Sequence, residues 1–388
     1  MSTIKPALIV PKMPPQAWLS SYVTPSLMTA RSYQIDTPKV SIKLDQNESP
    51  WDLPPAIKAK VVAKLLERPW NRYPAPFSDD IADQIARHAG VAPGTVLLGP
   101  GSNYLIALLL SVFGKGYGKQ NAGQVVIARP SFPLYESQCQ YEGIAYTPWE
   151  LNEDLEYDLS KLPPLRSGSM LLFASPNNPV GNTLPKAMLE DLLTRHPDTL
   201  FVADEAYFEY ADEPYTSLLG VHSNLLLLRT FSKTMGSAGV RIGYILGHDH
   251  YLQLLRKVRV PYLLNHFAIA CAEVLLNDSD TQAHLRQIQH NAVSQRQLMY
   301  EQLSAMQAVL GMRVKNSAAN FLLLRWPTTA AAEGAYAALI KAGILVRNVS
   351  GGPGLAGCLR LTLGDEQENA AVVAAFAAIC RHKTDGLT

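Results

Sequence analysis

The fold is decided by the stretch RTFSKTMGSAGVRIGY, residues 229–244, which places a lysine between two apolar runs. The run NLLLLR (224–229) leads into it, and IGYIL (242–246) closes it. Both runs are candidate strands, and runs such as LLLL (225–228) and LLFA (171–174) do not alternate polar with apolar residues. Both faces of such strands should be covered, as in a parallel sheet flanked by helices. A lone lysine is usually a solvated surface charge, whereas Lys233 follows a buried run and lies among small residues. We therefore expect Lys233 at the carboxyl end of a buried strand, where open α/β sheets bind ligands.

Further strands and helices alternate on both sides of this stretch. Three more apolar runs are expected to be strands of the same sheet: Gln124–Ala128, Met170–Ala174 and Leu200–Ala203. Helical periodicity predicts four helices: Ser102–Phe113, Pro185–Arg195, Thr281–Met306 and Ala331–Ala342. This order indicates an α/β fold whose large, mostly parallel sheet is flanked by helices, with residues 51–280 as its domain.

A smaller α+β domain is expected to follow over residues 281–388, with the helix Thr281–Met306 leading into it. It should contain two strands and a closing helix: Asn320–Arg325, Leu359–Thr362 and Glu368–Arg381. Residues 1–50 are rich in proline and show little periodicity, so they are expected to form an arm and part of the small domain. A length of 388 residues agrees with two domains.

The composition excludes several classes of protein. The 34 Lys and Arg residues nearly balance the 33 Asp and Glu residues, which gives no support for a nucleic-acid or anionic-membrane surface. No apolar run reaches the roughly 20 residues of a membrane span. The four cysteines lie far apart without a C-x-x-C pair, which favours thiols in a reducing compartment and a cytoplasmic location. HExxH, paired C-x-x-C and G-x-S-x-G motifs are all missing from the sequence, so no metal site and no esterase site is expected.

Clusters of polar, glycine and proline residues stand where the expected strands end. Because ligands bind at these strand ends, the clusters are the candidate site. They are Gly99–Asn103, Pro130–Tyr135, Ser175–Gly181, Asp204–Tyr207 and Thr230–Arg241.

Six motifs along the chain give the sequence a family resemblance. They are KLDQNESP (43–50), NRYP (71–74), SPNNPVG (175–181), ADEAY (203–207), RTFSKTMGSAGVRIGY (229–244) and CLRLTLGDEQEN (358–369). In this order the sequence resembles the class I/II aminotransferases of pyridoxal-phosphate (PLP) fold type I, and most of all the histidinol-phosphate aminotransferases. The motifs cover residues 43 to 369, nearly the whole chain.

The resemblance implies pyridoxal 5'-phosphate as cofactor and assigns three catalytic residues. Lys233 would hold the cofactor as a Schiff base and then act as general base. Asp204 would stabilise the proton on the cofactor's ring nitrogen, although an aspartate after a strand is more commonly a helix N-cap. Tyr207 and Asn178 would hydrogen-bond the cofactor's phenolic oxygen, and Phe132 would stack on its ring.

The same resemblance assigns a phosphate cup. Gly101, Ser102 and Asn103 open an expected helix whose N–H groups suit a phosphate. Ser232 and Arg241 would add a hydroxyl and a guanidinium. Tyr73 would reach this phosphate from the partner subunit, which implies a homodimer with shared active sites. The family usually has an acidic pair where this chain has Asn103 and Tyr104, which leaves the detail of the cup open.

Substrate recognition is assigned to two arginines and an asparagine. Arg360 would clamp the substrate's acidic group as a bidentate fork, and Arg347, 13 positions earlier, would help to bind a substrate phosphate. Asn47 in KLDQNESP is also expected to bind substrate. An N-terminal tyrosine contacts the substrate phosphate in the family, and Tyr22 and Tyr33 are both candidates.

The implied reaction is histidinol phosphate plus 2-oxoglutarate giving imidazole-acetol phosphate plus glutamate, a step of histidine biosynthesis. The small-molecule partners would be an amino donor and a 2-oxo acid. Two alternatives stay open: an aminotransferase for aromatic or other amino acids, and a decarboxylase of threonine phosphate. A regulator fused to a DNA-binding head would need more than the roughly forty residues before KLDQNESP. GPGLAG (352–357) matches a dinucleotide fingerprint but precedes a strand, so we interpret it as a loop over the site.

Overall fold

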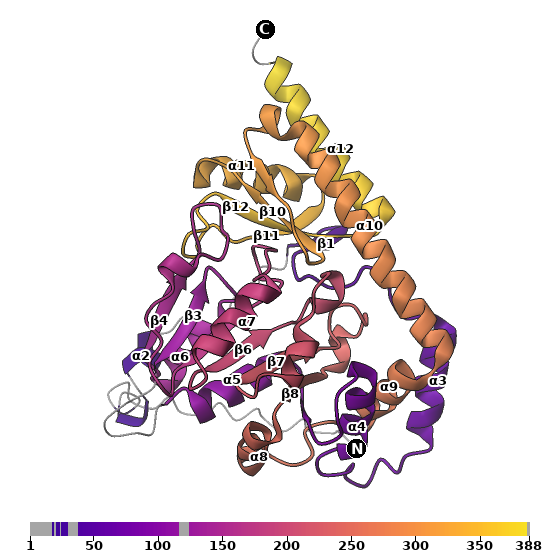
Figure 1. Ribbon diagram of the computed structural model, residues 1–388. Coiled ribbons are helices and arrows are strands. Elements are labelled where there is room, and N and C mark those ends of the chain that lie inside the picture. Colours follow the sequence, from indigo (N-terminus) through magenta and orange to yellow (C-terminus); the bar gives the residue numbers. More distant parts are fainter. Residues whose placement is uncertain (1–17, 19–20, 24, 30–37, 116–123, 386–388) are drawn as a thin grey trace.

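The computed structural model describes residues 18, 21–23, 25–29, 38–115 and 124–385 as two sheets with their helices. Figure 1 shows the larger sheet in the lower part of the molecule and the smaller one above it. The larger sheet has seven strands in the order β2-β8-β7-β6-β5-β3-β4. Their bounds are β2 Val96–Gly99, β3 Val125–Arg129, β4 Tyr146–Glu150, β5 Met170–Ala174, β6 Leu200–Asp204, β7 Leu225–Thr230 and β8 Gly243–Gly247.

This sheet is parallel from β4 through β3, β5 and β6 to β7, while β8 runs antiparallel to both β7 and β2. The expected α/β class and the five expected strands are confirmed, and no strand end differs by more than one residue from its expected position. The strands β2 and β4 were not expected. VLLG in β2 is short, and β4 contains a proline at an edge of the sheet, so neither run gives a strong signal.

Two layers of helices cover this sheet, because successive strand residues point to opposite faces. One face packs against α5 (Ser102–Phe113), α6 (Leu134–Glu142) and α8 (Asp249–Val258). The other packs against α3 (Pro55–Leu66), α4 (Asp79–Ala89), α7 (Lys186–Arg195) and α9 (His266–Asn277). The main core therefore lies on both sides of β3, β5, β6 and β7, and the ends of these strands are fixed rigidly.

The smaller sheet has five strands in the order β1-β11-β12-β10-β9. Their bounds are β1 Ile42–Leu44, β9 Arg313–Lys315, β10 Phe321–Arg325, β11 Ile344–Asn348 and β12 Cys358–Thr362. The expectation of two strands in this part was therefore too low. β1 and β9 have three residues each, and β1 becomes a strand only by pairing in parallel with the distant β11.

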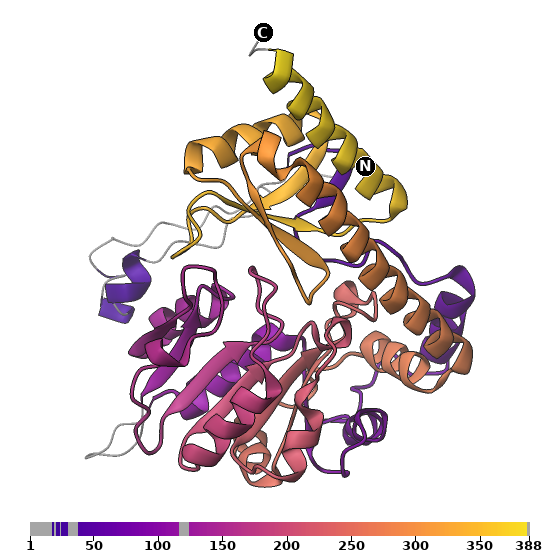
Figure 2. The same cartoon turned by 45° about the horizontal axis from the view of Figure 1, so that its top comes forward.

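Helices pack on one side of this smaller sheet, as Figure 2 shows. They are α10 (Ser279–Leu310), α11 (Thr329–Lys341) and α12 (Glu366–Asp385). The 32-residue α10 starts beside α9 and runs to the small sheet, so it connects the two parts of the molecule (Figure 1). It extends beyond the expected Thr281–Met306 at both ends, because Asp278 caps its start by accepting from the Thr281 N–H and Gly311 ends it in a left-handed conformation. A short helix, α2 (Pro25–Thr29), precedes β1, and the domain limits at residues 50 and 280 stay a prediction.

Candidate active site

Lys233 lies just beyond the end of β7, as the sequence predicts. Its Nζ donates a hydrogen bond to the backbone oxygen of Gln46, 3.1 Å away, in the segment that follows β1. Burial, together with the positive charges of Arg360 and Arg241, lowers the pKa of Lys233 to about 7, and the carboxylates of Glu48 and Asp204 oppose this only in part. An amine with such a pKa is substantially neutral near pH 7, which makes it a competent nucleophile and base.

Asp204 is the last residue of β6, and its side chain is buried. Oδ2 accepts a hydrogen bond of 2.6 Å from the hydroxyl of Tyr135, and Oδ1 accepts one of 3.0 Å from the Ala206 N–H. Burial raises the pKa of Asp204 to about 6, while these two hydrogen bonds act in the opposite direction. Only Oδ1 accepts from the turn that follows the strand, while Oδ2 binds Tyr135. Asp204 therefore does not act as a helix or turn cap alone.

Tyr207 is held by a chain of hydrogen bonds that begins in the small sheet. The Asn47 Nδ2 donates to the Tyr207 hydroxyl at 2.9 Å, and Thr362 Oγ1 donates to Asn47 Oδ1 at 3.0 Å. The backbone of Asn47 is left-handed, with φ of 54°, a conformation that asparagine tolerates. Asn47 is thus a buried link between Tyr207 and β12, and it is not among the residues that line the cavity described below.

The start of α5 and the turn before β8 form a narrow cradle. Gly101 has φ of 89°, and a Cβ there would stand 2.4 Å from Arg241 Nη2. A Cβ on Gly243 would stand 2.5 Å from the Ser102 backbone nitrogen, so the two segments approach as closely as glycine allows. The Arg241 Nη1 donates to Ser232 Oγ at 3.3 Å. A guanidinium, a hydroxyl and helix N–H groups meet here, which is a donor set for a phosphate.

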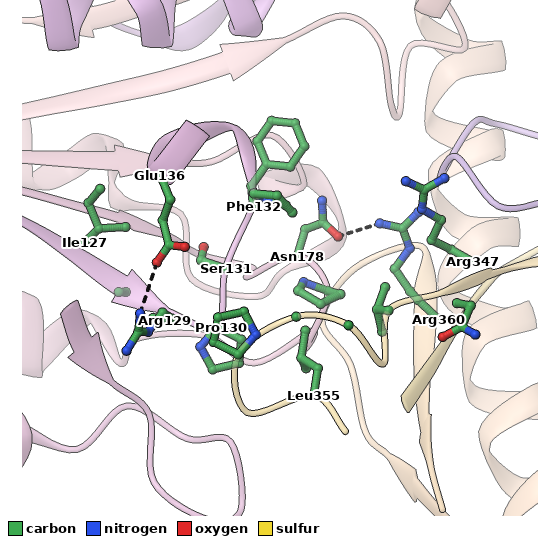
Figure 3. A pocket seen from close by; sticks show the side chains of 18 residues that line it. Ile127, Arg129, Pro130, Ser131, Phe132, Glu136, Asn178, Arg347, Leu355 and Arg360 are labelled. Carbon is green, nitrogen blue, oxygen red and sulfur yellow. Dashed lines mark hydrogen bonds and ion pairs between the residues drawn. The ribbon is translucent and has the colours of Figure 1, made fainter. Parts of the chain in front are cut away.

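Arg347 and Arg360 are direct partners across the antiparallel pair β11–β12. Figure 3 shows their guanidinium groups together at one end of a pocket. The Arg360 Nη1 donates to Asn178 Oδ1 at 2.6 Å, and its Nη2 donates to the Asp45 backbone oxygen at 2.5 Å. Like charges directly opposite each other on antiparallel strands destabilise a sheet. The pair therefore favours an anion at this end of the pocket.

The pocket beside these arginines has a volume of about 390 Å³. Phe132 and Asn178, which are candidate cofactor residues, line it together with the two arginines (Figure 3). Residues of the segment 351–355 close another side of it, so the expected loop GPGLAG does lie over the site. The ring of Phe132 contacts Tyr135 edge-to-face, with 5.7 Å between centroids.

Some candidate residues lie apart from this constellation. Tyr73 is 79% exposed, and its ring stacks on Tyr262 at 4.5 Å. Asn103 is exposed in the first turn of α5. Tyr22 is also exposed, and Tyr33 lies outside the described residues.

The structure also adds residues that the sequence did not single out. Tyr135 stands in the cluster Pro130–Tyr135, but only the packing of α6 brings its hydroxyl to Asp204. Thr362 lies in the motif CLRLTLGDEQEN, two residues after Arg360, and period-2 alternation places both on one face of β12. That alternation is a signal from which Thr362 could have been found.

Fold and site together define a class of protein, namely α/β proteins with a desolvated lysine, a buried carboxylate and a phosphate cradle at the strand ends. The sequence model of the family "Aminotransferase class I and II" matches residues 39–376. The chain belongs to this family and is a PLP-dependent aminotransferase.

Individual relatives point in the same direction. A histidinol-phosphate aminotransferase of Ralstonia nicotianae is 35% identical over 357 residues, which covers 89% of this chain and 91% of that protein. One of Ruminiclostridium cellulolyticum is 30% identical, covering 90% of this chain and 96% of that protein. The crystal structure of the histidinol-phosphate aminotransferase from Sinorhizobium meliloti in complex with pyridoxal-5'-phosphate superposes with a TM-score of 0.77 at 23% identity, covering 93% of this chain and 98% of that one. The last likeness shows the shared fold.

The residues present fit pyridoxal 5'-phosphate, the cofactor of the family. The cradle of Gly101, Ser232 and Arg241 suits its phosphate, since a side chain at position 101 would fill the space beside the guanidinium. The buried Asp204 suits a protonated ring nitrogen, and the low pKa of Lys233 suits attachment of an aldehyde.

Proposed function

We propose that this aminotransferase converts histidinol phosphate and 2-oxoglutarate into imidazole-acetol phosphate and glutamate, a step of histidine biosynthesis. The observation that carries the proposal is the pair Arg347 and Arg360, partners across β11–β12 at one end of the pocket. Two guanidinium groups match a phosphate dianion in charge, and either can bind it with two parallel hydrogen bonds. The names of the relatives that match nearly the whole chain support the same substrate.

The chain's own residues supply the proton chemistry and the orientation. Bound pyridoxal phosphate supplies an aldehyde for the substrate amine and a ring that accepts electrons. Lys233 Nζ takes up and releases the proton that leaves the substrate's amine-bearing carbon, for which a pKa of about 7 is well matched. Asp204 keeps the ring nitrogen protonated, and the hydroxyl of Tyr135 holds the carboxylate in place.

Asn178 and Tyr207 complete the orientation of cofactor and substrate. Asn178 accepts from Arg360, so the anion-binding end of the pocket is coupled to the cofactor-binding residues. Tyr207 is fixed through Asn47 to the small sheet. We therefore assign Asn47 a positioning role, beside its expected contact with substrate.

The proposal is tested by supplying the purified holoenzyme with 2-oxoglutarate and one amino donor at a time. Glutamate should form fastest with histidinol phosphate. Glutamate from phenylalanine or tyrosine, but not from histidinol phosphate, would favour the aromatic alternative. Release of carbon dioxide from threonine phosphate, with no glutamate formed from any of these donors, would favour the decarboxylase.

The protein is further proposed to be a homodimer with shared active sites. Tyr73 is well exposed yet held in a defined place by Tyr262, as expected for a side chain that serves a neighbouring subunit. Mixing Tyr73→Ala with Lys233→Ala protein after mild unfolding should restore part of the activity, because hybrid dimers have one site with both native residues. Hybrids that form but stay inactive would contradict sharing.

We further propose a cytoplasmic location, because the cysteines are free thiols. Cys139, Cys271 and Cys358 are buried thiols without a disulfide partner, as expected in a reducing compartment. As a separate observation, no helix in the described part of the chain has the length and apolarity that crossing a membrane requires. Cell fractionation would test the location directly.

A further inference from the structure

The pocket beside the cofactor residues has two chemically different ends. Arg347 and Arg360 stand at one end, and Glu136 stands at the other, next to Arg129 (Figure 3). Glu136 projects from α6, directly after Tyr135. It is the one carboxylate among the described residues that line this pocket. A ligand that fills the pocket therefore meets positive charge at one end and a carboxylate at the other.

The carboxylate of Glu136 is poorly satisfied by its surroundings. Its side chain is 23% exposed, and the buried Oε1 has no hydrogen-bond partner among the described residues. Arg129 Nη1 lies 3.7 Å from this oxygen, beyond hydrogen-bond distance. The same guanidinium instead binds Glu150, to which its Nε donates at 2.9 Å. One cation is thus shared between two carboxylates, and the charge of Glu136 is compensated only in part.

The pKa of Glu136 reflects this shortage of positive charge. Burial raises it most, and the neighbouring Glu150 raises it further, while Arg129 and a hydrogen bond with Tyr146 lower it. A partly buried carboxylate whose charge is only partly compensated is stabilised when a cation or an N–H donor binds to it.

We propose that Glu136 is a specificity-determining residue, whose carboxylate receives the positively charged or N–H-donating end of a substrate whose anionic end binds Arg347 and Arg360. The substrate class is an amino phosphate with a nitrogen heterocycle or other cationic side chain. The inference rests on the proposed function and deepens it, because the imidazole of histidinol phosphate is such a group and titrates near pH 6.5.

The test compares two phosphorylated donors that differ only in the ring. Histidinol phosphate has an imidazole, whereas phenylalaninol phosphate has the same phosphate and amine with a phenyl ring. Wild-type holoenzyme, Glu136→Gln and the control Glu142→Gln are compared by kcat/KM for each donor. Glu142 is on the same helix but pairs with Lys115 at 2.8 Å and does not line the pocket.

Glu136→Gln should lower kcat/KM for histidinol phosphate by about 10- to 100-fold, as for loss of a hydrogen bond to a charged group. It should leave kcat/KM for phenylalaninol phosphate unchanged, and Glu142→Gln should leave both unchanged. An equal loss with both donors would indicate a structural role for Glu136, and no loss with either would show that the residue does not bind substrate. Both results overturn the inference.

A binding measurement separates this inference from the proposed function. If wild-type protein does not turn over histidinol phosphate, the proposed function fails. The inference is then decided by the dissociation constants of the two phosphates, read from the absorbance of cofactor bound to Lys233→Ala protein with and without Glu136→Gln. A preference for the imidazole compound that Glu136→Gln abolishes supports it, and no such preference overturns it.

Discussion

The hydroxyl of Tyr135 gives the sharpest test of how the site is tuned. Tyr135→Phe removes the hydrogen bond of 2.6 Å to Asp204 Oδ2 and keeps the aromatic ring. A hydrogen bond to a charged group contributes about 1.5–3 kcal/mol, and 1.36 kcal/mol corresponds to one pKa unit. The pKa of Asp204, about 6 in the intact site, should therefore rise by about one to two units.

The consequence should appear in the pH dependence of the reaction. Removing a donor to the carboxylate stabilises the protonated form, so the acidic limb of kcat/KM should move to higher pH by about one to two units. Near neutral pH a larger share of Asp204 would be protonated and unable to hold the proton of the cofactor ring. At pH 7 we expect kcat to fall by about 2- to 10-fold, in proportion to the loss of ionised Asp204, with little change in KM for the amino donor.

Tyr157→Phe is the matched control. The Tyr157 hydroxyl is also buried and donates to the Ala174 backbone oxygen at 2.5 Å, so its loss removes one buried hydrogen bond without touching Asp204. If folded Tyr135→Phe keeps the wild-type pH profile, or if Tyr157→Phe shifts the profile by the same amount, the hydroxyl of Tyr135 does not set the pKa of Asp204.

Three further perturbations probe the cofactor site and its support. The rate at which apoprotein takes up pyridoxal phosphate should rise about tenfold per pH unit below pH 7 and level off above it, because only neutral Lys233 attacks the aldehyde. A rise that continues toward pH 10 would contradict the lowered pKa of Lys233. Gly101→Ala should weaken cofactor binding in equilibrium dialysis by about tenfold or more, because the new Cβ displaces Arg241. Unchanged binding would show that the cradle does not hold the cofactor. Glu205→Gln should lower the free energy of unfolding in denaturant by about 3–5 kcal/mol, because it leaves the charge of buried Arg229 uncompensated; a loss below about 1 kcal/mol would contradict this.

The sequence predicts well those parts whose signals are local. The helix α5 begins and ends where the pattern predicts, because Gly101 directly precedes its first residue and Gly114 directly follows its last. The strands β5 and β7 were found for a similar reason, since each contains an uninterrupted apolar run, MLLFA in β5 and LLLL in β7.

What the sequence could not predict depends on distant contacts. The strand β1 exists through its pairing with β11, about three hundred residues away. The same distance separates Asn47 from Thr362, so the link between Tyr207 and the small sheet has no local pattern. A buried tyrosine such as Tyr135 looks like an ordinary core residue until α6 is packed against the sheet and its hydroxyl meets a carboxylate.

Chemical trapping can show whether Lys233 is the residue that holds the cofactor. The protein is incubated with pyridoxal phosphate, treated with borohydride to make the attachment permanent, digested and examined by mass spectrometry. The pyridoxyl label should be found on the peptide that contains Lys233 and should be lost from Lys233→Ala protein. A label on another lysine, or no label in wild-type protein, would show that Lys233 does not hold the cofactor.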